Sequence, residues 1–406
     1  MNNVSKSLRF QIGIFGRTNV GKSSFLNMIT GQKVSIVSPQ PGTTTDVVEK
    51  VMEYRPVGPV VFLDTAGIDD SSRLSTERLQ RTEAVFDRAD VFAVITENGF
   101  WGEYEDWLRE KALLKKVPFV IIVNKIDVYP LSDDFQKKLN AVTPHVMSCS
   151  CVDIDNSEKE AVKDTFGKIL AACGEEGSPH KQTLVRDLFP KGGLAVLVVP
   201  VDAGAPKGRL IMPQVQTIRE ILDGDSAALV VKESEYGSVL PMLSGKPDIV
   251  ICDSQVVQKV IAQTEQDVPC TTFSVLFARF KGDLTKAAGG AASINKLKKC
   301  DRVLIAEACT HHAAEDDIGR VKIPRWLRQH TGLDLQIDVC SGRDYPRDLE
   351  QYSLIIHCGA CMLTRREMLS RCSEAAEKGV PITNYGLAIS YFQGVFERVM
   401  EPFREL

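Results

Sequence analysis

The feature that most constrains this chain is a glycine-rich loop, GRTNVGKS at residues 16–23, which follows the apolar run RFQIGIF. It fits the pattern G-x-x-x-x-G-K-S/T in the strand-loop-helix context that a phosphate-binding loop requires. In such a loop the backbone N–H groups wrap around phosphates at the start of the next helix. Lys22 is predicted to reach the β- and γ-phosphates, and the Ser23 hydroxyl to bind Mg²⁺. The residues predicted to contact the nucleotide here are Gly16, Asn19, Val20, Gly21, Lys22, Ser23 and Ser24.

A second motif, DTAG, begins at Asp64, ends at Gly67 and closes the strand-like run VVFLD. A carboxylate at this place holds magnesium through water, and we expect the Gly67 amide to contact the γ-phosphate. Between the two motifs, the segment PGTTTD at residues 41–46 is predicted to be a switch loop that gives a threonine to the metal. Thr44 is the preferred threonine, and Thr43 is the alternative. The predicted catalytic residues are Lys22, Asn19 and Thr44.

The third and fourth motifs concern the base of the nucleotide. NKID follows the strand-like run PFVIIV and supplies Asn124, Lys125 and Asp127. The Asp127 carboxylate can accept hydrogen bonds from N1–H and the 2-amino group of guanine, a pattern that adenine does not offer. Ser148, Cys149 and Ser150 follow at the spacing where a backbone amide is predicted to bind guanine O6. Four motifs in this order predict a domain that binds and hydrolyses GTP.

Together the four motifs resemble those of the translation-factor-like GTPases, in particular the branch of Era and of the tRNA-modification GTPase. Ras-type enzymes have a glutamine after the second motif that orients the attacking water, whereas this chain has Ile68. Asn19 matches a residue that, in relatives of this branch, helps a potassium ion (K⁺) replace an arginine finger. The alternative for Asn19 is a turn asparagine with an unusual backbone angle. Slow GTP hydrolysis that K⁺ stimulates is therefore expected.

The composition argues against several other classes of protein. Over 406 residues, 49 basic and 53 acidic side chains give a net charge of −4, so no overall field favours nucleic acid or an anionic membrane. No apolar run reaches the roughly 20 residues that span a bilayer, and no apolar signal region is visible. The 11 cysteines are an odd number and do not suggest a secreted disulfide framework. We expect a cytoplasmic protein with no nucleic-acid and no membrane partner.

Alternating strand-like and helical runs predict an α/β fold: a P-loop GTPase domain with a mostly parallel sheet, followed by two further α/β domains. The GTPase domain is predicted at residues 1–172, ahead of the polar linker CGEEGSPHKQ. A second unit without a catalytic motif is predicted at residues 182–267, and a third at residues 268–406. In the third unit, strands are expected in TTFSVLFARF, DRVLIAEAC, LDLQIDVC and YSLIIHC, and a helix in TRREMLSRCSEAAEKG.

Cysteines and histidines gather in the third unit, after two of these strands. One group contains Cys309 and His311, and the other contains His357, Cys358 and Cys361. Because the carboxyl ends of parallel strands meet in one crevice, the two groups can share one ligand. The predominance of thiolates favours an iron-sulfur cluster over structural zinc, which usually closes its tetrahedron within a compact knuckle. A redox dithiol and buried structural cysteines are the remaining alternatives.

Over nearly its full length the chain resembles the family of FeFe-hydrogenase maturation GTPases known as HydF. The resemblance rests on the GTPase domain, a middle unit without catalytic motifs, and a Cys-x-His with a distant His-Cys-x-x-Cys. It implies a 4Fe-4S cluster bound by Cys309, Cys358 and Cys361. It also implies a scaffold on which the two-iron subcluster precursor is assembled and from which it is delivered to apo-FeFe-hydrogenase. Two radical-SAM maturation enzymes are implied as partners, and the middle domain is implied to make a homodimer.

The sequence leaves the fourth iron ligand open. His311 or His357 could supply it, as could an acid at Glu315 or Asp316. The rival interpretation of the whole chain is a ribosome- or tRNA-linked GTPase with a zinc-bound C-terminal domain. That rival predicts a basic RNA-binding module after the GTPase domain, whereas this chain is acidic overall and continues as βα repeats.

Overall fold

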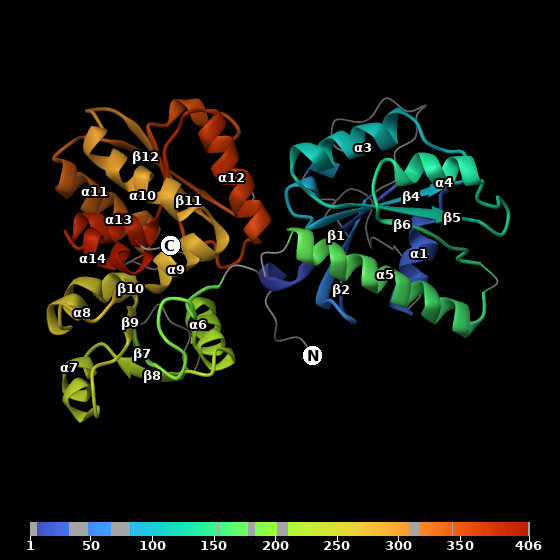
Figure 1. The fold of residues 1–406 in the computed structure, drawn as a ribbon. Helices are drawn as coiled ribbons and strands as arrows, with labels where there is room; N and C mark the ends of the chain where they lie inside the picture. The colour runs from blue at the N-terminus through green and yellow to red at the C-terminus, as the bar shows by residue number, and fades with distance from the viewer. Residues whose placement is uncertain are drawn as a thin grey trace. The chain divides into compact units, whose positions relative to one another are not determined.

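The computed structural model describes residues 6–31, 48–65, 82–83, 85–152, 154–177, 183–200, 210–308, 317–342 and 344–404. The chain divides into two compact units, residues 1–181 and residues 182–406, and Figure 1 shows the elements of each. Within the described ranges, no helix is long and apolar enough to cross a membrane.

The first unit is built on a six-stranded sheet with the strand order β2-β3-β1-β4-β5-β6. All neighbouring strands pair in parallel except β2 and β3, which are antiparallel. The strands are β1 (Phe10–Phe15), β2 (Val48–Tyr54), β3 (Gly58–Asp64), β4 (Val91–Glu97), β5 (Phe119–Asn124) and β6 (Val146–Ser148). The helices are α1 (Lys22–Thr30), α3 (Glu103–Leu114), α4 (Asp133–Asn140) and α5 (Asn156–Gly177), preceded by the 3-10 turn η1 (Lys6–Leu8).

Strand β1 lies in the interior of this unit, and helices cover both of its faces. Ile12 packs with Phe25 of α1 and Phe166 of α5 in one apolar core. Phe15 packs with Leu108 of α3 in a second core on the other face. A strand buried on both sides reads as a continuous apolar run, as FQIGIF does. The mostly parallel sheet confirms the predicted GTPase fold and places the ends of β1, β3 and β5 at one edge.

The second unit holds two four-stranded sheets, both parallel throughout. The first has the order β10-β9-β7-β8 and consists of β7 (Leu194–Val199), β8 (Ala227–Lys232), β9 (Ile249–Cys252) and β10 (Cys270–Thr272). The second has the order β12-β11-β13-β14 and consists of β11 (Arg302–Glu307), β12 (Gln336–Ser341), β13 (Leu354–His357) and β14 (Ile382–Asn384). The two further α/β domains of the prediction are thus confirmed.

Helices connect these strands in both sheets. The α-helices are α6 (Met212–Asp223), α7 (Tyr236–Val239), α8 (Val257–Gln263), α9 (Phe273–Lys281), α10 (Leu284–Ala292), α11 (Ile323–Thr331), α12 (Arg365–Glu377), α13 (Tyr385–Phe392) and α14 (Phe396–Met400). The short turns are η3 (Leu240–Met242), η4 (Ser254–Val256), η5 (Ser293–Lys296), η7 (Leu349–Gln351) and η8 (Glu401–Phe403), with a π-helical turn η6 (Ile318–Lys322).

One apolar core joins the two sheets of the second unit. Val250 of β9 and Val275 of α9 share this core with Leu387 of α13. The Asn384 side chain, at the end of β14, also donates a hydrogen bond of 2.7 Å to the Ser274 carbonyl oxygen in α9. Helix α9 therefore belongs to the packing of both domains.

The prediction of a strand in TTFSVLFARF is wrong, because most of this segment forms helix α9. The Thr272 hydroxyl caps the helix by accepting a hydrogen bond from the Val275 amide at 3.2 Å. The buried residues Phe273, Leu276 and Phe277 have the i, i+3, i+4 spacing of one helix face. A half-buried strand would instead bury every second residue. Strand β10 pairs with β9 in the second domain, whereas the predicted boundary at residues 267–268 assigns it to the third.

Candidate functional site

The phosphate loop lies between β1 and α1, as predicted. Three of its residues have positive φ angles, Gly16 at 148°, Asn19 at 65° and Gly21 at 94°, so the loop needs residues that tolerate this backbone. The Lys22 ammonium donates to the carbonyl oxygens of Gly16 at 2.9 Å and Arg17 at 2.7 Å. Helix α1 has no side-chain cap at its start, which leaves its first amides for an anion. Ser23 and Ser24 are exposed there.

Asn124 ties the phosphate loop to the end of β5. Its side-chain amide donates a hydrogen bond of 2.9 Å to the Val20 carbonyl oxygen. A Cβ atom at Gly21 would lie only 2.2 Å from the same amide nitrogen, so this close approach requires glycine. Three predicted nucleotide residues therefore position one another before any ligand binds.

Asp64 stands at the end of β3 with a buried carboxylate. Its Oδ1 atom has no hydrogen-bond partner among the described residues. Burial raises the pKa of Asp64 to about 6, and the nearby Lys22 ammonium offsets part of that rise. A buried carboxylate oxygen without a partner fits a group that binds magnesium through water. Thr43, Thr44, Gly67 and Ile68 lie outside the described residues, so their predicted roles stay predictions.

The base-recognition residues meet at the ends of β5 and β6. The Ser150 hydroxyl donates a hydrogen bond of 2.7 Å to the Asp127 carboxylate and so orients it. Lys125 adopts a positive φ of 61°, and its ammonium pairs with Glu97 at 3.0 Å. No motif indicates the Ser150 contact beyond the short polar run that contains this residue.

Of the three residues predicted to offer an amide to guanine O6, Cys149 has its amide engaged within the sheet. This amide donates a hydrogen bond of 2.9 Å to the Val123 carbonyl oxygen and so continues the pairing of β6 with β5. Ser148 likewise lies in that pairing, opposite Val123. Among the described contacts, none uses the backbone amides of Ser150 or Cys151, which makes these the better candidates for guanine O6. The Cys149 thiol is buried, 3.8 Å from the Asn124 side-chain oxygen.

The His-Cys-x-x-Cys segment lies where β13 ends, beside the end of β11. The Cys358 amide donates a hydrogen bond of 2.8 Å to the Ala306 carbonyl oxygen. The Ala308 amide in turn donates to the Cys358 sulfur at 3.1 Å. The residue after Ala308 is Cys309, which lies outside the described residues together with His311, Glu315 and Asp316. The structure thus places the Cys-x-x-Cys loop beside Ala308, the last described residue before Cys309.

His357 does not serve as a free ligand in this arrangement. The side chain is fully buried, and its Nε2 atom lies 2.8 Å from the Arg371 guanidinium. Because arginine only donates, Nε2 accepts this bond, and Nδ1–H donates to the Cys358 carbonyl oxygen at 2.9 Å. Burial and the Arg371 charge lower the pKa of His357 to about 3, so the imidazole stays neutral. Both nitrogens are engaged, which argues against His357 as the fourth iron ligand.

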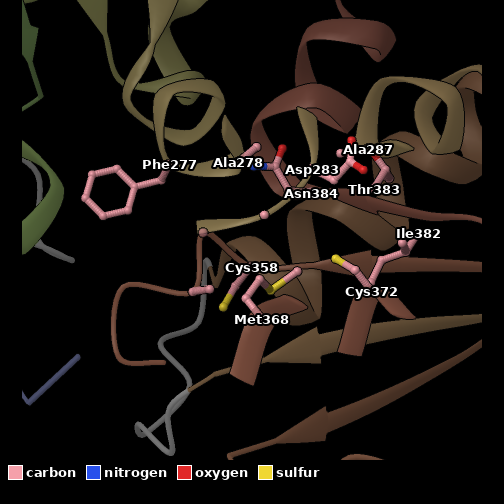
Figure 2. Close-up of a pocket in the computed structure, with 13 residues that line it drawn as sticks. Phe277, Ala278, Asp283, Ala287, Cys358, Met368, Cys372, Ile382, Thr383 and Asn384 are labelled. Atoms are coloured by element: carbon pink, nitrogen blue, oxygen red, sulfur yellow. The ribbon is translucent and has the colours of Figure 1, made fainter. Parts of the chain in front are cut away.

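Cys358 also borders a pocket, which Figure 2 shows in close-up. The pocket is lined by Cys358 and Met368 together with Ala278 of α9 and Asn384 of β14. Among the described residues, no group of three histidine, cysteine or acidic side chains lies close enough to hold a metal ion. Two charged residues lie near the Cys-x-x-Cys loop, Arg371 and Lys281. Neither belongs to a sequence motif, so their contacts with this loop were not predicted.

Guanine recognition is tested by changing Asp127 to Asn. This change replaces an acceptor with a donor opposite the purine 2-position, so we expect binding to shift from GTP to XTP by about two orders of magnitude. Binding of fluorescent GTP and XTP analogues measures the ratio. Ser150→Ala is the matched control, because it keeps the Asp127 carboxylate and should weaken GTP binding without changing the preference. A persistent preference of Asp127→Asn for GTP would reject the assignment.

Comparison with curated proteins matches the first unit to known GTPases. A segment of 125 residues is 42% identical to the tRNA modification GTPase MnmE of Synechococcus sp. (strain JA-3-3Ab), covering 30% of this chain and 26% of the relative. A segment of 119 residues is 34% identical to the GTPase Era of Carboxydothermus hydrogenoformans, covering 29% of this chain and 40% of the relative. The chain therefore spans well under half of either relative. The solved structure of Aquifex aeolicus Era is 18% identical, with a TM-score of 0.33 over 55% of this chain and 92% of that one.

Family models match all three domains. Residues 11–125 match the 50S ribosome-binding GTPase model, which confirms the predicted GTPase domain. Residues 184–282 match the hydrogen maturase F dimerization domain, and residues 285–402 match the hydrogen maturase F tetramerization domain. The two hydrogen maturase F models together account for more than half of the chain and leave little of the second unit unmatched. With both of these domains behind a GTPase domain, the chain belongs to the hydrogen maturase F family of hydrogenase maturation GTPases.

Proposed function

We propose that this GTPase is an iron-sulfur scaffold and carrier that delivers a two-iron subcluster precursor to apo-FeFe-hydrogenase. The observation that carries the proposal is the hydrogen bond of 3.1 Å from the Ala308 amide to the Cys358 sulfur. It brings the residue before Cys309 next to the Cys-x-x-Cys loop, in a chain whose domains match hydrogen maturase F. The proposed 4Fe-4S ligands are Cys309, Cys358 and Cys361. Two radical-SAM maturation enzymes are the proposed partners, by family resemblance alone.

The donor set fits such a cluster. Cys358 and Cys361 offer soft thiolates, which iron-sulfur sites prefer, and an N–H hydrogen bond to a sulfur stabilises its negative charge. Arg371 holds His357, and His357 holds the Cys358 carbonyl group, so the loop conformation is fixed by side chains that do not themselves bind metal. Three protein thiolates leave a fourth iron position with an exchangeable ligand, which suits a site that accepts and releases a guest cluster. His311, Glu315 and Asp316 remain the candidates for that position.

Cysteine substitution tests the iron site. In the Cys358→Ser, Cys361→Ser double variant, bound iron should fall several-fold after anaerobic reconstitution, because hydroxyl groups are poor iron-sulfur ligands. Iron and zinc analysis of oxygen-free preparations measures the effect. GTP hydrolysis should survive, because the nucleotide residues lie in the other compact unit.

Cys300→Ser is the matched control, because Cys300 is exposed and lies before β11 in the same domain. The remaining cysteines that should be dispensable for iron are Cys149, Cys151, Cys173, Cys252, Cys270, Cys340 and Cys372. Full iron retention in the double variant contradicts the proposal. One zinc ion and no iron in the unaltered protein would instead favour the zinc-bound GTPase.

The proposed hydrolysis is slow and uses a potassium ion that Asn19 helps to bind. Wild-type hydrolysis should be at least about tenfold faster in potassium than in sodium. This acceleration is much smaller than the one that an arginine finger provides. Equal ionic strength in the two salts removes the effect of general screening. Asn19 has a φ of 65°, so Asn19→Gly keeps this backbone while deleting the side-chain amide. The variant should hydrolyse GTP at the same low rate in both salts, and equal wild-type rates would leave Asn19 as a turn residue.

We also propose that the protein forms a homodimer through its dimerization domain. Among the described residues, strand β8 is the edge of its sheet and therefore offers unpaired backbone groups to a second copy. Beside it, the chain exposes large apolar side chains on β8, on α6 and just before α6, a composition that favours burial in an interface. These side chains are Leu210, Ile211, Val215, Leu222 and Val230.

Charge placed on this face should separate the protomers. In the Leu222→Lys, Val230→Lys double variant, two like charges would meet their copies across a twofold interface, so the dimer should dissociate at micromolar concentration. Light scattering coupled to size exclusion reports the mass. Met242→Lys is the control, because Met242 is 79% exposed in the same domain but lies on the turn η3. An unchanged mass in the double variant would place the interface elsewhere.

A further inference from the structure

Lys281 is a buried lysine whose ammonium is surrounded by the Cys-x-x-Cys loop. The residue is 1% exposed. Its Nζ atom donates to the carbonyl oxygens of Ala360 at 3.0 Å, Cys361 at 3.2 Å and Leu363 at 2.7 Å. An ammonium has three N–H donors, so these three carbonyl groups account for all of them.

The loop that Lys281 contacts contains a residue in an unfavourable backbone conformation. Ala360 has a φ of 51°, a left-handed conformation that costs a residue with a Cβ about 1 kcal/mol. Its carbonyl oxygen accepts from the Leu363 amide at 3.1 Å as well as from Lys281. The lysine therefore closes the same turn that carries Cys361 and leads into helix α12. Loss of these bonds would leave a strained turn with fewer interactions to hold it.

Lys281 does not belong to the domain whose loop it holds. It is the last residue of α9, within the residues 184–282 that match the dimerization domain. Phe273 and Phe277 anchor α9 in the apolar core beneath β7 and β9. The Cys358–Leu363 loop lies within the residues that match the tetramerization domain. Through Lys281, the domain proposed to make the dimer thus contacts the proposed iron loop directly.

The charge of Lys281 is not neutralised by any of its three hydrogen-bond partners, since all three are neutral carbonyl groups. A buried charge is expensive unless an opposite charge lies near it. Burial lowers the pKa of Lys281 to about 8, and the nearby Cys361, Glu367 and Cys358 offset part of that fall. The Glu367 carboxylate already accepts hydrogen bonds from the amide and hydroxyl of Thr364. When Cys358 and Cys361 bind metal as thiolates, they would supply the counter-charge.

We propose that Lys281 is a positioning residue of the iron site, which clamps the Cys358–Leu363 loop from the dimerization domain and holds a positive charge against the backbone carbonyl groups of that loop. The proposal rests on the proposed function for its iron chemistry. The clamp itself concerns the protein alone and can be tested without iron.

Hydrogen exchange in the iron-free, full-length protein tests the clamp. The amides of Cys358 and Leu363 both donate hydrogen bonds in this region and report on the loop. In Lys281→Met they should exchange at least about tenfold faster, the effect of losing one charge-assisted hydrogen bond. Lys286→Met is the matched control, since Lys286 is an exposed lysine of neighbouring α10 with Asp283 as its ion partner at 3.6 Å. In this control variant, the Cys358–Leu363 loop should exchange at the wild-type rate.

Amides of α9 and β11 in the same measurement show whether the domain remains folded. If they also lose protection in Lys281→Met, the milder Lys281→Gln variant, which keeps a donor without the charge, answers the same question. Loop protection equal to that of the wild type in a folded variant would overturn the clamp.

Reconstituted protein tests the charge. A residue that only packs would change stability, whereas loss of a positive charge should shift the midpoint potential of the bound cluster to more negative values. Lys281→Met should also release iron to a chelator several-fold faster than Lys286→Met. A wild type that binds no iron would reject the proposed function while leaving the loop-exchange result standing. Iron-loaded Lys281→Met with an unchanged potential would reject the role of the charge.

Discussion

The parallel pairing of β11 with β13 is the constraint on which the C-terminal site depends. Its register sets Ala306 opposite His357, so the two strands end within one residue of each other. The following residues then meet: the Cys358 amide reaches the Ala306 carbonyl group, and the Ala308 amide reaches the Cys358 sulfur. A shift of the register by one residue would move Cys358 away from the strand end that leads to Cys309. The position of the site therefore depends first on the pairing of these two strands, and only then on any single ligand residue.

Both units use a buried lysine to hold the carbonyl groups of a loop at a strand end. Lys22 donates to two carbonyl groups of the phosphate loop, and Lys281 donates to three of the Cys-x-x-Cys loop. The two lysines differ in origin. Lys22 follows its own loop in the chain and can exchange carbonyl oxygens for phosphate oxygens when nucleotide binds. Lys281 comes from another domain, and its three donors are all occupied by the loop, so its role is to fix a conformation.

The sequence could predict the sites to the extent that spacing encodes them. The phosphate loop, the DTAG motif and the NKID motif each occupy a few consecutive residues after a buried strand, and the strands form as expected. What spacing does not encode was missed: the Ser150 contact to Asp127, the Arg371 contact from the following helix α12, and the Lys281 contact from α9, which lies 82 residues before Leu363. The helix α9 was misread because apolar residues on both faces of a buried helix resemble a buried strand over a short segment.

The position of His357 shows why a histidine next to a cysteine was a poor guide to ligation. Successive residues of a strand point to opposite faces of the sheet, so His357 and Cys358 cannot both face one crevice while the strand continues through them. His357 ends β13 with its ring fully buried, and its two nitrogens are taken by Arg371 and the Cys358 carbonyl group. Cys358 leaves the strand and meets the Ala308 amide instead. The histidine thus acts on the cysteine through the backbone, and this alternation could have been applied to the sequence alone.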